Sequence, residues 1–419
     1  MGLTFRRSWN GWPGSAGLIG RAANGTRLTA PDRGVLGARK RVGRARRPIL
    51  VRLNAHAPRV AVPEEDWIMR IAVIPGDGIG KDVTAEAVKV LRSVSEVFGR
   101  ALDLEMLPYG ADYFLETGIS MPPNGYTMLR DEFDAVYIGA LGDPRVPDMR
   151  HARDILLGTR FELDLYVNHR PVKLFDARLC PLKGRGPADV NFVVFRENTE
   201  GMYVGIGGRF KAGTEDEIAI QEDINTYKGV HRIIRHAFEH AKAKGLTRVC
   251  MADKSNALTM GHALWQRVFW EVAPQYPAIE PTHLYIDALT MQMVKNPGQF
   301  QVIVTNNMFG DIITDLGAQL QGGLGMAASG NLHPGRTSMF EPVHGSAPKY
   351  AGKNVANPFG AILSAALMLE YLGRDTEARA VEAAVEHAVV TGNGPAEIGG
   401  TLGTAETGDF VAGRIRSQK

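Results

Sequence analysis

The sequence predicts an α/β protein built around a buried, mostly parallel sheet. Two observations support this prediction. Short, almost entirely apolar runs recur along the chain, and each is separated from the next by a longer stretch with helical periodicity. The polar residues that could carry chemistry follow these runs directly, where active sites of open α/β sheets gather. The main runs are residues 71–75, 135–139, 192–195, 248–251 and 302–304.

The first element is a strand at residues 71–75, followed by a glycine-rich turn, Gly76–Gly80, and a helix at about residues 82–98. Strand, glycine-rich turn and helix in this order resemble a dinucleotide-binding fingerprint. However, the third glycine comes one residue too early for G-x-G-x-x-G, and no strand-end acid follows about 20 residues later. We therefore expect a fold that is not of the Rossmann type.

Three arginines lie near the next elements. Arg160 and Arg170 belong to the segment that follows the strand at 135–139, and Arg196 stands directly after the strand at 192–195. A guanidinium group matches a carboxylate with two parallel hydrogen bonds. Together the three would suit a substrate with two or more carboxylates, whereas each alone could be a surface ion pair.

Further candidates follow the later strands. Lys254 comes after the strand at 248–251 and could act as a base if neighbouring positive charge lowers its pKa. Tyr203 could supply a proton. Asp287 closes the apolar strand at 283–286 and could provide a metal ligand.

The strand at 302–304 leads into a helical pattern that carries Asp311 and Asp315. Residues four apart share one face of a helix, so these two carboxylates project side by side. Mg²⁺ prefers carboxylate and substrate oxygens, which makes the pair a candidate metal site. The alternative is a solvated first turn, where acidic side chains favour the positive end of the helix dipole.

Bulk composition limits the classes of function. The chain of 419 residues is long enough for two domains, and no apolar run approaches the ~20 residues that cross a bilayer. Its two cysteines, Cys180 and Cys250, are too few for a disulfide framework. The net charge is +3, but residues 1–63 alone carry +12, which leaves −9 for the remainder. An acidic body argues against a nucleic-acid partner.

Residues 1–68 form a basic extension rich in Gly, Ala, Arg and Pro, and we expect them not to fold. Three interpretations stay open: a start codon placed too early, an organellar transit peptide, or a nucleic-acid-binding arm. We favour the first, and expect a cytoplasmic protein unless the extension is a genuine transit peptide.

Several motifs from Arg70 to about Gly413 resemble the metal-dependent β-decarboxylating dehydrogenases, which include isopropylmalate, isocitrate, homoisocitrate and tartrate/D-malate dehydrogenases. They occur in the order found in that family. The matching segments are 74–80, 160–170, 196–201, 253–256, 307–315, 341–348 and 356–358.

The resemblance implies a two-domain, three-layer fold, with a large cofactor domain at 69–165 plus 322–419 and a small domain at 166–321. It also implies a homodimer with shared active sites, in which Lys254 and Asp287 act on the partner subunit. Mg²⁺ or Mn²⁺ would be held by Asp287, Asp311 and Asp315, with Lys254 as base and Tyr203 as proton donor.

The remaining residues implied by the resemblance bind substrate and cofactor. Leu156, Leu157, Arg160, Arg170 and Arg196 would contact the hydroxy di- or tricarboxylate. The cofactor, NAD⁺ or NADP⁺, would lie on the loop formed by His344, Gly345, Ser346, Ala347, Pro348, Lys349 and Tyr350, together with Asn357. No nucleic acid or membrane is expected among the partners. A non-catalytic regulatory subunit is disfavoured, because the metal aspartates and the base are all present.

The residues that would set the substrate and the cofactor resemble different members of the family. Leu156 and Leu157 suit an isopropyl group, which favours 3-isopropylmalate and hence leucine biosynthesis. Arg153 stands where a second distal carboxylate could bind, as in homoisocitrate enzymes, and the 196–201 motif is closer to tartrate/malate and isocitrate members. Lys349 and Tyr350 resemble NADP-dependent isocitrate dehydrogenases, whereas the leucine pathway argues for NAD⁺.

Overall fold

The computed structural model describes residues 68–418. Of the predicted basic extension at 1–68, all but Ile68 lies outside the described residues, so the three interpretations of it stay open.

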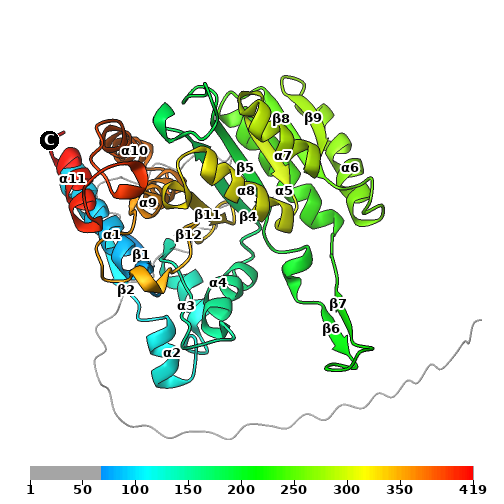
Figure 1. Ribbon diagram of the computed structural model, residues 1–419, viewed down its shortest axis with the longest axis horizontal. Helices are drawn as coiled ribbons and strands as arrows, with labels where there is room; N and C mark the ends of the chain where they lie inside the picture. The colour runs from blue at the N-terminus through cyan, green and yellow to red at the C-terminus, as the bar shows by residue number, and fades with distance from the viewer. Residues whose placement is uncertain (1–67, 419) are drawn as a thin grey trace, which may run out of the picture. The chain divides into compact units, whose positions relative to one another are not determined.

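A single ten-stranded sheet runs through the described part of the chain, in the order β2-β1-β3-β12-β11-β4-β5-β10-β8-β9 (Figure 1). Its strands are β1 (Met69–Ile74), β2 (Leu102–Met106), β3 (Ala135–Ile138), β4 (Val167–Lys173), β5 (Asn191–Glu197), β8 (Arg248–Asp253), β9 (Glu280–Tyr285), β10 (Val302–Thr305), β11 (Ala328–Leu332) and β12 (Ser338–Pro342). Six of the nine neighbouring pairs are parallel, which confirms the predicted mostly parallel sheet.

The two parallel blocks of this sheet run in opposite directions. Three consecutive antiparallel pairs, β12–β11, β11–β4 and β4–β5, separate β2-β1-β3-β12 from β5-β10-β8-β9. The site residues predicted to follow strands lie at or after the carboxyl ends of those strands, although the strands of the two blocks end at opposite edges of the sheet. They approach one another at the centre, where the end of β5 lies beside the end of β10 and the start of β4.

Helices cover both faces of the sheet and make three layers. The helices are α1 (Ile79–Phe98), α2 (Ala111–Thr117), α3 (Gly125–Glu132), α4 (Arg150–Glu162), α5 (Tyr227–Ala243), α6 (Gly261–Val272), α7 (Ile286–Lys295), α8 (Asn307–Leu320), α9 (Phe359–Tyr371), α10 (Asp375–Val390) and α11 (Thr404–Arg416). The largest core cluster joins one sheet face to α1, α5, α6 and α9 to α11. On the other face, α3 and α4 share one cluster, and α7 and α8 share another.

The alternation of side chains along β1 explains this layering. Ile71 and Val73 belong to the first cluster, whereas Ala72 and Ile74 belong to the cluster of α3 and α4. Because successive side chains of a strand point to opposite faces, a strand buried on both faces is apolar throughout.

Two element boundaries differ from the sequence prediction, and both matter for the site. Helix α8 begins at Asn307, and the side chain of Asn306 caps it by accepting from the Phe309 backbone N–H at 2.8 Å. Asp311 and Asp315 therefore lie in the second and third turns, which removes the first-turn interpretation. The strand predicted to end at Ile286 ends at Tyr285 instead, so Asp287 lies in the first turn of α7.

A two-stranded hairpin, β6 (Gly207–Phe210) with β7 (Ile218–Gln221), extends away from the sheet (Figure 1). The division into a large domain at 69–165 plus 322–419 and a small domain at 166–321 stays a prediction.

Candidate active site

Arg160 is held by a buried carboxylate, which an asparagine amide fixes in turn. It lies in the last turn of α4, buried, and its Nη2 donates to Glu341 Oε1 at 2.9 Å. The amide of Asn331 donates to the same oxygen at 2.8 Å. Glu341 thus holds the guanidinium in a fixed orientation at the junction of α4 and β12.

Arg170 and Arg196 project from neighbouring strands, β4 and β5, toward α8. Arg196 donates through Nε to Asn307 Oδ1 at 2.9 Å and through Nη1 to Asp311. Arg170 donates through Nη1 to Thr314 Oγ1 at 2.6 Å, with Asp311 Oδ1 at 3.6 Å. Close approach of helix and strand requires Gly310, because a Cβ there would lie 2.5 Å from both Cβ and Cγ of Arg196.

All three arginines are nearly inaccessible to solvent, with exposed fractions of 6%, 7% and 3% in chain order. The Nε atoms of Arg160 and Arg170 are buried and donate to no acceptor among residues 68–418. Guanidinium groups match carboxylates in charge and geometry, so three of them buried together would suit an anionic ligand. Their burial argues against three surface ion pairs, and the carboxylate-binding role stays a prediction.

Asp311 and Asp315 differ in their electrostatic surroundings. Burial disfavours ionisation of Asp311, but the charges of Arg196 and Arg170 outweigh it, and the pKa of Asp311 is lowered. Burial followed by repulsion from Asp311 raises the pKa of Asp315, although Arg170 partly opposes this. A divalent cation would neutralise the repulsion between the two carboxylates.

Asp311 and Asp315 have no third metal-binding side chain grouped with them among the described residues. No group of three or more His, Cys, Asp or Glu side chains that could hold a metal ion occurs in the part of the chain that the structure describes. Asp311 and Asp315 supply hard oxygen ligands on adjacent turns of α8, so they fit Mg²⁺ or Mn²⁺ as two members of a larger set.

Tyr203 lies in a short 3₁₀ turn, η3 (Met202–Val204), beside this centre. Its hydroxyl donates to Asp311 Oδ2 at 3.1 Å, and the Arg196 guanidinium carbon lies 5.4 Å from its ring centroid. Burial and the neighbouring Asp311 carboxylate raise the pKa of Tyr203. The phenol therefore keeps its proton at neutral pH and is available as a donor.

Lys254 and Asp287 form a separate pair. Lys254 Nζ lies 2.6 Å from Asp287 Oδ1, and the pair joins the end of β8 to the start of α7. The Lys254 backbone N–H is fixed by His262 Nδ1 at 2.8 Å. Among the described residues, no hydrogen bond or ion pair joins this pair to Asp311 or Asp315. The structure thus brings Asp311, Asp315, Tyr203 and the arginines together but leaves Lys254 and Asp287 apart.

The predicted cofactor loop interlocks with the glycine-rich turn after β1. The Ile79 backbone N–H donates to the Ser346 carbonyl at 2.8 Å, and a Cβ on Gly78 would lie 2.1 Å from that oxygen. Gly78 has a φ of +54°, which also favours glycine. The glycines of this turn therefore serve close packing of two loops rather than a Rossmann phosphate site.

The other residues of the predicted cofactor loop differ in burial and backbone conformation. His344 is buried, its Nε2 has no partner among the described residues, and burial lowers its pKa. Ala347 has a φ of +34° and precedes η7 (Pro348–Tyr350), in which Lys349 Nζ lies 4.7 Å from the Tyr350 ring centroid. Asn357 lies nearby in sequence and contacts Met326 Sδ at 3.6 Å.

Helix α4 presents the predicted substrate leucines on the side of Arg160. Leu156 and Leu157 are half-buried, and Leu156 also packs against the core cluster of α3 and α4. Arg153, seven residues before Arg160, shares its helix face. Its side chain is exposed, and its Nε lies 3.9 Å from Asp154 Oδ1.

Sequence reasoning gave no role to three buried acids around this site. Asp77 accepts from the Ala111 and Gly142 backbone N–H groups at 2.7 and 2.8 Å and contacts His151 Nε2 at 2.9 Å. Glu341 orients Arg160, and Glu197 organises the turn after β5. Each stands within or beside a strand, and an acid within an otherwise buried strand is the pattern that could have identified two of them.

The chain matches the family model described as isocitrate/isopropylmalate dehydrogenase over residues 70–412. The chain belongs to this family. It is 45% identical over 352 residues to a 3-isopropylmalate dehydrogenase of Thermobifida fusca, covering 84% of this chain and 98% of that protein. A decarboxylating D-malate dehydrogenase of Escherichia coli is 43% identical over 352 residues, covering 82% of this chain and 97% of that protein.

Solved structures show the same fold. An isocitrate dehydrogenase from Methylococcus capsulatus gives a TM-score of 0.76 at 34% identity, covering 83% of this chain and all of that chain. A β-decarboxylating dehydrogenase from Thermococcus kodakarensis gives 0.69 at 38% identity, covering 84% of this chain and 97% of that one. The predicted family, its α/β fold and an oxidoreductase within it are confirmed. None of the helices in residues 68–418 has the length and apolar character needed to cross a bilayer.

Proposed function

We propose that the chain catalyses the oxidative decarboxylation of a 2-hydroxy acid that bears a 3-carboxylate. The observation that carries this proposal is the set of three buried arginines around Asp311. The first candidate substrate is 3-isopropylmalate, which would yield 4-methyl-2-oxopentanoate with NAD(P)⁺. Supporting it are the leucines on α4 and the name of the Thermobifida relative.

The chain's own residues would supply positioning and proton transfer. When bound, the nicotinamide accepts a hydride from the hydroxyl-bearing carbon, and a divalent ion stabilises the negative charge that develops as CO₂ leaves. Arg160, Arg170 and Arg196 hold the substrate carboxylates in a fixed orientation. Lys254 takes the hydroxyl proton, and Tyr203 protonates the carbon from which CO₂ departed.

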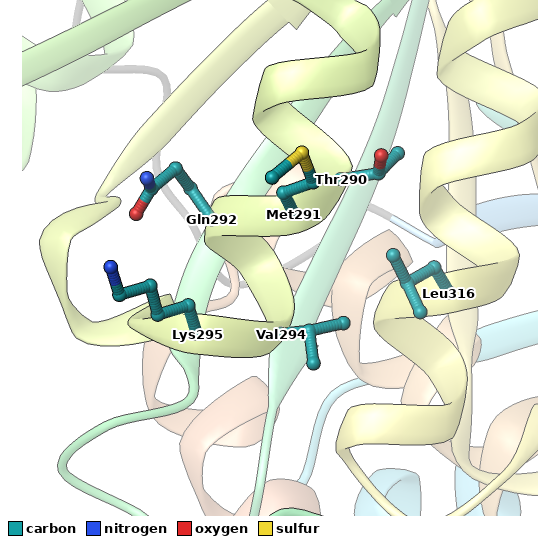
Figure 2. Close-up of a pocket in the computed structure, with 6 residues that line it drawn as sticks. All are labelled: Thr290, Met291, Gln292, Val294, Lys295 and Leu316. Atoms are coloured by element: carbon teal, nitrogen blue, oxygen red, sulfur yellow. The ribbon is translucent and has the colours of Figure 1, made fainter.

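Lys254 and Asp287 would reach this centre from a second copy of the chain. Asp287, Met291 and Val294 lie four and three residues apart on α7, so they share one helix face. Met291 and Val294 are exposed, and Ile312 on α8 is exposed beside Asp311. Figure 2 shows Met291 and Val294 with Leu316 of α8 around a surface hollow. Burying this apolar face in a symmetric dimer would carry Asp287 toward the partner's α8.

A mixing experiment tests the shared site. Lys254→Met and Asp311→Asn chains should each be inactive as homodimers. After unfolding and refolding together, half of the dimers are mixed and each contains one intact site, so about 25% of wild-type activity should return. If no activity returns while the mixed dimer forms, each site is built from one chain and the proposed sharing is wrong.

A substrate panel tests the reaction and its specificity. With Mg²⁺ and either cofactor, kcat/KM is measured for 3-isopropylmalate, isocitrate, homoisocitrate, D-malate and tartrate. We expect 3-isopropylmalate to be preferred, because burial of its branched group against Leu157 would contribute about 1–3 kcal/mol. Preference for homoisocitrate, abolished in Arg153→Ala, would instead assign a second carboxylate to Arg153. Turnover of isocitrate alone would refute the leucine argument.

Cofactor preference is the finer part of the proposal. Lys349 is exposed at the tip of the cofactor loop, where its charge would attract the 2′-phosphate of NADP⁺. We expect Lys349→Asp to shift the ratio of kcat/KM toward NAD⁺ by about tenfold or more. A wild-type enzyme that already prefers NAD⁺ tenfold would rule out this role for Lys349.

A further inference from the structure

The segment from β5 to η3 contains two proposed site residues, Arg196 and Tyr203, and a buried acid between them. Glu197 is 2% exposed at the end of β5. Its carboxylate accepts from the Thr199 backbone N–H at 3.0 Å, the Thr199 hydroxyl at 2.8 Å and the Glu200 backbone N–H at 2.7 Å. One side chain therefore accepts from three donors of the turn that follows it.

No salt bridge to Glu197 is present among residues 68–418. The groups that face the turn carry charge of both signs. Arg232 of α5 donates to the Thr199 hydroxyl at 2.7 Å and to Asp164 Oδ2 at 2.9 Å rather than to Glu197. Glu200 adds a second negative charge, and Arg196 of β5 is directed to α8. The carboxylate is thus held by dipoles, without a cation of its own.

Further hydrogen bonds fix the part of the turn that leads to Tyr203. The Glu200 carbonyl accepts from Asn307 Nδ2 at 2.9 Å, and its carboxylate accepts from the Thr226 backbone N–H at 2.8 Å. Gly201 pairs with Ile224 through an N–H to carbonyl bond of 2.8 Å. After these fixed points the chain enters η3, where Tyr203 reaches Asp311.

We propose that Glu197 is a positioning residue that sets the place of Tyr203 by holding the turn at residues 198–202. This inference rests on the proton-donor role proposed for Tyr203. Glutamine in place of Glu197 keeps size and shape but turns one acceptor into a donor that faces the Glu200 N–H. The turn would be held less tightly there, whereas the stability of the fold would increase because a charge is no longer buried.

Amide hydrogen exchange on the full chain tests the hold without any substrate. In Glu197→Gln, peptides covering residues 198–203 should exchange at least about tenfold faster, with unchanged exchange elsewhere and an unchanged Tm. Glu386→Gln, an exposed acid of α10, is the matched control and should match wild type. Unchanged exchange at 198–203 in Glu197→Gln would overturn the proposal.

A second pair of variants covers the case in which Glu197→Gln fails to fold. Thr199→Val removes the hydroxyl donor and should loosen the same segment, whereas Thr199→Ser keeps the donor and should restore wild-type exchange. If both behave alike, the turn is not held through these bonds.

Kinetics separate this proposal from the role of Tyr203. Glu197→Gln should lower kcat about tenfold or more with little change in KM, and it should have no further effect in a Tyr203→Phe background. Equal losses in both backgrounds would show that Glu197 does not act through Tyr203. If Tyr203→Phe itself is fully active, the proton-donor role fails, while the exchange result still decides whether Glu197 holds the turn.

Discussion

Two charged regions of this molecule have opposite character. Around Asp311, the chain assembles three buried arginines, a tyrosine and a capped helix, and most of the polar groups there have partners. Lys254, partly exposed, and Asp287, exposed, form an ion pair at the β8–β9 edge of the sheet, and Asp287 lies on the same face of α7 as the exposed Met291 and Val294. The charged groups of the first region contact one another. Lys254 and Asp287 contact each other, but among the described residues they form no hydrogen bond or ion pair with Asp311 or Asp315.

The difference indicates where each region obtains its stabilisation. Buried arginines in the first region are held by Asp311, Asn307, Thr314 and Glu341, so their removal would disturb the fold. An exposed ion pair such as Lys254–Asp287 contributes little to stability. The second region can thus be changed with little effect on folding of the chain.

The largest expected effect comes from Lys254→Met. Loss of a general base reduces kcat by about 10²–10⁴-fold, whereas the free energy of unfolding should change by less than about 1 kcal/mol. Steady-state kinetics and urea unfolding measure the two quantities. If Lys254→Met loses much of its stability and its activity falls in proportion, Lys254 supports the fold, and the difference proposed between the two regions is wrong.

An intermediate effect is expected from Gly310→Ala in the buried region. The new Cβ would meet Arg196 Cβ and Cγ at 2.5 Å, so α8 or the guanidinium must move. Overpacking of this kind costs about 1–3 kcal/mol of stability, and substrate KM should rise as Arg196 shifts. Gly413→Ala in α11 is the control, because its Cβ would have no neighbour within 4 Å and should be neutral or stabilising. Equal effects of both substitutions would show that contact with Arg196 is unimportant.

The sequence predicted one kind of feature well and another poorly. Strands buried on both faces, such as β1 and β10, are apolar without interruption, so local composition identifies them. The two parallel blocks run in opposite directions because β11 and β4 lie between them in antiparallel pairs. The residues of one strand do not show which strands it pairs with, so this reversal could not be predicted from local composition.

The site divides in a similar way. Arg196 and Asp311 were predictable because each follows a strand that is easy to identify. The position of Glu197 within a buried strand could have identified it, but its role could not be predicted, because that role depends on the backbone N–H groups of a turn, which any residue type can supply. The start of α8 at Asn307 was missed because the capping residue, Asn306, was assigned to the loop before the aspartates.

The smallest and most specific effect distinguishes the two aspartates of α8 from each other. The pKa of Asp311 is lowered, so its ionised form adds stability above the ordinary carboxyl pKa and loses it as pH falls through the lower value. The pKa of Asp315 is raised, first by burial and then by Asp311, so its ionised form costs stability as pH rises through the raised value. With metal removed by a chelator, Asp315→Asn should therefore raise the Tm slightly at pH 7 and leave it unchanged below pH 4, whereas Asp311→Asn should lower it at pH 7. Added Mg²⁺ should stabilise wild type and neither variant, since both carboxylates would serve as ligands. A stabilising Asp311→Asn would mean that its arginines do not compensate for its burial, and the two regions would then differ less than their geometry indicates.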